Sequence, residues 1–379
     1  MMLDFIKKNG LVFLLFAPIA LMAQGQESLG VTTYYFSDSG GNSVSTTSFN
    51  LAKKVFGRTV LLFDLELDNV TVPPVTASTG ATRPSRESSK EFQKTRSQAI
   101  VGIEQGLDAY TSLMISGYRS HEQDYQSTSL IGSLSRELNE QNTTVTVRGQ
   151  YIGDQVGEIL ADGTVFYRDK TTYWGAVNIS QLMSPTVVLN FSYDGIYYDG
   201  FLSDPYRQVR VFDETNDFEA SPEMHPDTRL RQALTAKFSK AIPDIEASFF
   251  STYRYYWDDW EVASHTADLQ FNKYVNPEVI VRMDYRYYTQ GDAYFWQERY
   301  RGEQFSETGT SLRTADYKLR SFSSNNFGLS LSYLFKEVAR KNRELAFLEN
   351  ATIEIRYFRY FNTLDFSANI YQLNVNLGI

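Results

Sequence analysis

Ser264, His265 and Asp268 lie almost side by side and carry side chains that hydrolases use. Histidine accepts a proton near neutral pH and can activate a serine. However, side chains alternate between the two faces of a β-strand, which places His265 opposite the other two unless a bulge intervenes. We therefore favour a structural role for His265 at the interface between a membrane and water. A hydrolase within the membrane is kept as the minor alternative. His121 and His225 have acidic neighbours in predicted loops, which favours solvated loops over weak cation sites.

Two adjacent carboxylates, Asp258 and Asp259, stand between Trp257 and Trp260. Hard cations such as calcium bind about six or more oxygen ligands, and two carboxylates do not fill that shell. The pattern is more typical of a tight hairpin with Trp257 and Trp260 at the outer membrane interface, where amphipathic rings are favoured. The chain also has no cysteine for thiolate chemistry. We predict no catalytic residue, no metal site and no cofactor.

The most informative polar residues are charged side chains that alternate with apolar or aromatic ones. In the segment 279–287, Arg282, Asp284 and Arg286 share one face of a predicted strand. A charge on the lipid face near the bilayer midplane costs about 2–4 kcal/mol, so such faces are expected to point into the lumen of a barrel. The predicted lumen-facing charges are Glu66, Arg148, Glu246, Arg254, Arg282, Asp284, Arg286, Glu354 and Arg356.

These charges allow two functions. If they line an open lumen, the chain is a channel or export conduit for a small polar solute or a partner segment. The two arginines beside Asp284 would then give it a preference for anions. If charges on neighbouring strands pair, they brace an occluded lumen, and the barrel is a scaffold that binds an envelope partner.

Positioning these residues requires β-strands, and period-two alternation runs through the chain from about residue 30, except in the segment 335–347, which has some helical periodicity. The last segment is the clearest. Its apolar face is expected to contact lipid, and its polar face holds uncharged amides and glycine. The apolar residues are Tyr371, Leu373, Val375, Leu377 and Ile379. This ending resembles the C-terminal signature of bacterial outer-membrane barrels, which implies contact with the barrel-assembly machinery.

The alternation predicts an all-β fold, a single transmembrane antiparallel up-and-down barrel of about sixteen strands, with fourteen as the alternative. Short turns alternate with longer connectors, as in barrels with periplasmic turns and extracellular loops. The predicted strands are 30–38, 43–54, 58–69, 96–105, 107–119, 124–137, 141–153, 171–183, 185–198, 228–241, 244–257, 260–273, 276–290, 315–335, 349–362 and 366–379. A secreted sandwich or propeller is less favoured, because its strands usually have about 5–6 residues.

Composition and the N-terminus agree with export. The 379 residues carry a net charge of −9, which argues against binding to nucleic acid. A basic start, an apolar run and small residues predict a signal peptide at 1–23, with cleavage possible after 25 instead. The mature barrel is expected at 26–379, in the lipid of the outer membrane of a Gram-negative bacterium.

Three stretches carry a family resemblance. They are Gly200-Phe-Leu-Ser-Asp-Pro-Tyr-Arg207, Tyr253-Arg-Tyr-Tyr-Trp-Asp-Asp-Trp260 with Ser264-His-Thr266, and Tyr118-Arg-Ser-His-Glu-Gln-Asp-Tyr125. Together they resemble a family of bacterial outer-membrane barrels known only as a domain of unknown function. The resemblance supports the fold and location. Some relatives are thought to be encoded beside a flavin transferase and a small lipoprotein, which implies an envelope lipoprotein or redox partner.

Overall fold

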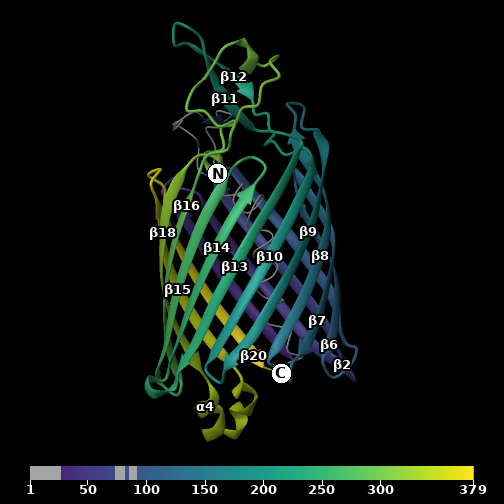
Figure 1. Cartoon of the computed structure of the whole chain (residues 1–379), viewed down its shortest axis with the longest axis vertical. Helices are drawn as coiled ribbons and strands as arrows, with labels where there is room; N and C mark the ends of the chain where they lie inside the picture. Colours follow the sequence, from purple (N-terminus) through teal and green to yellow (C-terminus); the bar gives the residue numbers. More distant parts are fainter. Residues whose placement is uncertain (1–26, 73–81, 85–91, 379) are drawn as a thin grey trace.

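The computed structural model describes residues 27–72, 82–84 and 92–378. The predicted signal peptide and Ile379 lie outside the described residues. Sixteen of the described strands form a closed antiparallel barrel, in which each strand pairs with the next and the last returns to the first (Figure 1). This confirms the predicted up-and-down barrel and its strand number.

The strands agree with the predicted segments, with some differences at their ends. They are β1 (Ser28–Asp38), β2 (Ser43–Phe56), β3 (Thr59–Val72), β5 (Phe92–Gly106), β6 (Thr111–Glu122), β7 (Tyr125–Leu138), β8 (Thr143–Ile159), β9 (Val165–Ser184), β10 (Val187–Gly200), β13 (Thr228–Ile242), β14 (Ala247–Asp258), β15 (Ala263–Asn276), β16 (Val279–Gln290), β18 (Phe322–Leu334), β19 (Thr352–Asn362) and β20 (Ser367–Gly378). The predicted strand 315–335 begins only at Phe322. A 3-10 helix, η4 (Tyr317–Leu319), precedes it, and the Asp316 side chain caps this helix by accepting from the Lys318 amide at 3.1 Å.

Each strand has an apolar outer face and a mixed inner face. Along β3, Leu61, Leu65 and Leu67 are exposed on the outside, whereas Val60 and Leu62 are buried on the inside. The same alternation continues around the barrel. A band of exposed apolar side chains is what a lipid-facing surface needs. Within the described residues, no helix is both long enough and apolar enough to cross a membrane.

The barrel closes between its first and last strands. β1 and β20 pair along their length, from Ser28 opposite Gly378 to Asp38 opposite Ala368. Tyr371 and Leu373 are exposed on the outer face of β20. Because closure leaves no strand edge, every strand of the barrel finds hydrogen-bonding neighbours on both sides.

The two ends of the barrel differ (Figure 1). At one end lies the structure that we call the cap, made of residues 201–227 and 291–321 together with β4 (Thr82–Pro84). In the cap, β11 (Arg207–Phe212) pairs with β4, β12 (Phe218–Pro222) and β17 (Tyr300–Arg301). The opposite end, the α4 end, carries α4 (Lys336–Lys341) and η5 (Arg343–Leu348), within the segment that showed helical periodicity.

Candidate functional site: the inner wall and the cap

The predicted lumen-facing charges occupy inward positions on barrel strands, with the exception of Glu246. Their neighbours in sequence, such as Val147, Tyr253, Met283 and Ile355, are exposed on the outer face. That these charges line a water-filled passage stays a prediction.

Glu246 differs because the turn between β13 and β14 is longer than the sequence pattern predicted. Pro243 lacks an amide hydrogen and starts the 3-10 helix η2 (Pro243–Ile245) instead of extending a strand. Glu246 caps this helix in a left-handed conformation, with φ of 50°, and is exposed at the α4 end. Its place in the lumen-facing set was wrong.

Glu354 on β19 is the centre of one inner-wall network. Arg356 Nη2 lies 2.6 Å from Glu354 Oε2, and Arg282 Nη1 lies 3.3 Å from Glu354 Oε1. Ser332 and Asn374 donate to the same carboxylate at 3.2 and 3.0 Å. The charge of Arg282 is therefore partly neutralised by the carboxylate of Glu354, which belongs to a strand distant in sequence.

Arg286 pairs with Asp268 on the adjacent strand β15. Its side chain is nevertheless 56% exposed, although it points inward. The positive excess predicted from β16 alone is thus reduced, because Arg282 meets a carboxylate of β19 and Arg286 meets one of the adjacent strand β15. Arg286 still presents an exposed cation on the inner face of the barrel.

A second network lies on β3, β5 and β6 near the cap end. Arg96 Nε donates to Asp68 at 2.6 Å, and its Nη2 lies 3.2 Å from Glu66. Lys94 Nζ lies 2.5 Å from Glu122 Oε2. Of these residues, only Glu66 was predicted from the sequence to face the lumen. The polar residues at every second position, 94, 96 and 98, were the sequence signal for a hydrophilic inner face along this part of β5.

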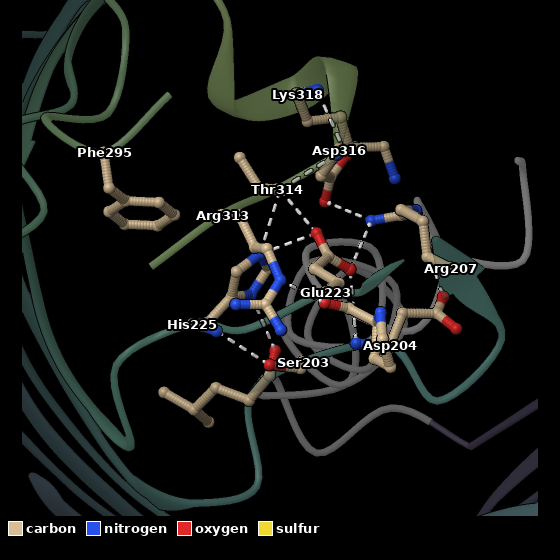
Figure 2. Close-up of polar contacts among 12 residues, drawn as sticks. Ser203, Asp204, Arg207, Glu223, His225, Phe295, Arg313, Thr314, Asp316 and Lys318 are labelled. Atoms are coloured by element: carbon tan, nitrogen blue, oxygen red, sulfur yellow. Dashed lines mark hydrogen bonds and ion pairs between the residues drawn. The ribbon is translucent and has the colours of Figure 1, made fainter. Parts of the chain in front are cut away.

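The Gly200–Arg207 motif builds the buried polar centre of the cap (Figure 2). Arg207 Nη1 lies 3.1 Å from Asp316 and 3.4 Å from Glu223, and its Nη2 lies 3.7 Å from Asp204. The carboxylates belong to separate loops, so one guanidinium holds the cap segments together. A buried cation among three carboxylates has strong geometric specificity.

His225 lies beside this centre and is wholly buried, which corrects the prediction of a solvated loop. Its Nε2 is 2.6 Å from Glu223 Oε1 and 2.9 Å from Thr314 Oγ1. The ring also contacts Trp260 and Phe295, with centroids 5.2 and 5.5 Å away. No local sequence pattern indicated that these aromatic rings, distant in the chain, would cover His225.

Arg313 and Tyr300 complete the cap. Arg313 Nε donates to the Pro222 carbonyl at 2.7 Å, and its Nη1 donates to the carbonyls of Gly309 and Ser311 at 3.0 and 2.9 Å. Burial raises the pKa of Tyr300, whose hydroxyl donates to the Phe295 carbonyl at 2.9 Å. These contacts are structural, since they satisfy backbone groups of the loops.

The second motif forms the junction between barrel and cap. Asp258 accepts from Arg229 Nε at 2.9 Å, from Tyr256, and from the amides of Trp260 and Val262 at 3.0 Å each. This is the hairpin tip that the sequence predicted.

The two tryptophans beside this tip have different environments. Trp260 is only 3% exposed and packs with Leu202 and Phe295, so its prediction as an interface residue was wrong. Arg229 lies over its ring at 4.1 Å. Trp257, by contrast, stacks on Tyr255, with centroids 5.4 Å apart.

The structure does not bring Ser264, His265 and Asp268 together as the hydrolase hypothesis requires. His265 is exposed on the outer face, where its Nδ1 lies 2.6 Å from the Tyr253 hydroxyl. Ser264 and Asp268 occupy inward positions of the same strand, as the alternation predicted. In the described part of the chain, no group of three or more acidic or histidine side chains has the spacing of a metal site.

Comparison with solved structures gives distant matches. One is OpdK of Pseudomonas aeruginosa with vanillate, at 8% identity, covering 93% of this chain and 97% of that chain, with a TM-score of 0.43. Another is OccK2 (OpdF) of the same species in complex with glucuronate, at 10% identity, covering 93% of this chain and 96% of that chain, with a TM-score of 0.45. A third is the CymD monoaromatic hydrocarbon channel, at 8% identity, covering 96% of this chain and 92% of that chain, with a TM-score of 0.45.

Family membership is clearer. No curated protein matches the chain. Residues 39–166 and 161–377 match the family described as "Protein of unknown function (DUF3570)", and these segments include all three motifs that carried the resemblance. The chain therefore belongs to this family of proteins of unknown function.

Proposed function

We propose that this protein is an outer-membrane channel of a Gram-negative bacterium that conducts a small polar solute or a polar segment of a partner. Barrels of about sixteen to eighteen strands are wide enough to leave an aqueous channel. The sixteen barrel strands of this chain place apolar residues outside and many charged residues inside. This pattern fits a polar interior within a lipid-facing shell.

One observation carries the proposal. Arg286 points inward from β16, yet over half of its side chain is exposed even though Asp268 is its partner. Exposure on the inner face means that no described side chain fills the space beside it. A guanidinium in that position is expected to be hydrated, and hydrated charge is what a water-filled passage requires.

Conductance across a planar bilayer tests the proposal. Purified protein should give discrete current steps in potassium chloride, and a heat-denatured aliquot should give none. Insertion is verified independently by heat-modifiable migration of protein recovered from the membrane. Correctly inserted protein that carries no current would refute the channel.

The cap favours a second candidate, a scaffold that binds an envelope partner. The cap contains a four-stranded sheet and a buried network of ion pairs, which together make a folded surface instead of a simple connecting loop. The cap exposes the aromatic side chains of Phe218 and Tyr294 on its surface. The family resemblance points to a lipoprotein or redox protein as the partner. A scaffold should lack conductance, and deletion of residues 213–217 at the hairpin tip should weaken co-purification of the partner without affecting the barrel.

A further inference from the structure

The inner wall carries opposite charge excesses on opposite sides of the barrel. Strand order places the quarter β2–β6 across the lumen from the quarter β13–β16, because each strand of a closed barrel of sixteen faces the strand eight positions away. We call these quarters the acidic wall and the basic wall. Both are defined by the inward-facing side chains of the described residues.

Carboxylates exceed cations on the acidic wall. The inward carboxylates are Asp64, Glu66, Asp68, Glu104 and Glu122. The inward cations on the same strands are Lys54, Lys94 and Arg96. Lys94 and Arg96 are both engaged with carboxylates of this wall. Asp64 and Glu104 have no ion-pair partner among the described residues, so they carry its excess.

Cations exceed carboxylates on the basic wall. The inward cations are Arg229, Arg231, Lys237, Arg254, Arg282 and Arg286. The inward carboxylates are Asp258, Asp268 and Asp284. Asp258 and Asp268 are occupied by Arg229 and Arg286. Lys237 is exposed, lies over the Phe250 ring at 5.3 Å, and has no carboxylate partner within the described ranges.

Asp64 on the acidic wall and Lys237 on the basic wall lie at similar depth, on strands seven positions apart around the barrel. Asp64 lies five positions from the α4 end of β3, which begins at Thr59, and Lys237 lies five positions from the α4 end of β13, which ends at Ile242. Opposite charges on low-dielectric walls produce a field across the water between them. Such a field acts on the dipole of a solute more than on its net charge.

From this arrangement we infer that the transported solute is a small zwitterion, a molecule with an ammonium group at one end and a carboxylate at the other. The inference rests on the proposed channel function. A zwitterion aligned across the lumen presents its carboxylate to the basic wall and its ammonium group to the acidic wall. Both interactions are favourable in one orientation, whereas a simple anion or cation meets one attractive and one repulsive wall.

Proteoliposome swelling with two isomeric solutes tests this inference. Glycine is zwitterionic and glycolamide is its uncharged isomer, so the pair differs in charge distribution at the same mass. The wild-type protein should admit glycine faster than glycolamide. Exposed charge interactions of this kind are modest, so we expect a ratio of about two to three.

Two double variants separate the transverse field from charge content. D64N/K237Q removes one charge from each wall and should lower the glycine-to-glycolamide ratio towards one, because it weakens the field between the walls. D154N/K170Q also changes one aspartate to asparagine and one lysine to glutamine, but it removes an ion pair between the adjacent strands β8 and β9, which belong to neither wall, so its ratio should stay near the wild-type value. The single variants D64N and K237Q serve if the double variant does not fold, and each should give an intermediate ratio.

The outcomes distinguish the two proposals. If neither solute enters liposomes that contain folded wild-type protein, the channel itself is refuted, and the zwitterion inference fails with it. If both solutes enter but wild type does not favour glycine, the channel stands and the inference is overturned. An equal fall in ratio in both double variants would also overturn it, because the effect would then follow charge number.

Discussion

Replacing Asp258 by asparagine tests whether one carboxylate joins the cap to the barrel. Asp258 has a wholly buried side chain and accepts from two backbone amides through Oδ1, and from Arg229 and Tyr256 through Oδ2. Asparagine keeps the shape, but it loses the charge and points an N–H donor at groups that are themselves donors. The junction should then open locally while the barrel remains closed.

The magnitude follows from the burial. Breaking a buried ion pair by removing one partner costs about 3–5 kcal/mol, because the remaining charge stays buried. Arg229 is 12% exposed, so the lower end of that range applies. A loss of about 3 kcal/mol corresponds to a roughly hundredfold increase in the equilibrium constant for local opening.

Hydrogen exchange measured by mass spectrometry reports this opening. The amides of Trp260 and Val262 donate to Asp258, so peptides covering 259–264 should exchange about a hundredfold faster in D258N. D259N is the matched control, because Asp259 is the exposed neighbour and its side chain makes no hydrogen bond or ion pair with the described residues of the junction. Equal exchange in the two variants would show that the carboxylate of Asp258 does not hold the junction.

Three further predictions concern topology, assembly and selectivity. A cysteine at Glu214 in the cap should react with an impermeant thiol reagent on intact cells, and one at Asp244 in the α4-end turn should not; the reverse result would mean an inverted barrel. Deleting residues 371–379 should abolish outer-membrane accumulation, because unpaired strand edges in lipid cost several kcal/mol per group, and normal levels of heat-modifiable protein would contradict this. Changing Arg282 and Arg286 to glutamine should shift the reversal potential towards cations by exposing their acidic partners, and an unchanged potential would exclude these arginines from the conducting path.

The barrel was predictable because its signal is local. Alternation along 276–290 and 366–379 assigns inner and outer faces residue by residue, and the turn residues between strands set the count. A run of proline and acidic residues at Pro243 was harder to interpret, since a 3-10 helix and a strand start are both compatible with it. Glu246 was misplaced for that reason.

The cap was not predictable because its contacts are long-range. Val211 pairs in parallel with Tyr300, and Arg207 meets Asp316 from a loop more than a hundred residues away. No periodicity within either segment encodes such a pairing. Trp260 illustrates the consequence: its position beside a hairpin suited the membrane interface, whereas cap residues from two other loops bury it.

The pairing of β1 with β20 also determines when the protein can fold. Ser28 and Gly378 are neighbours in the sheet but lie at opposite ends of the chain, so the last strand must be present before the first one finds both of its partners. The entropy of closing so long a loop grows only slowly with length, by about 0.6 kcal/mol for each doubling. The difficulty is therefore kinetic, because two apolar strand edges stay unpaired until the final step and are prone to aggregation. Folding must wait until essentially the whole chain is available, and until then the chain depends on being held unfolded in a soluble form.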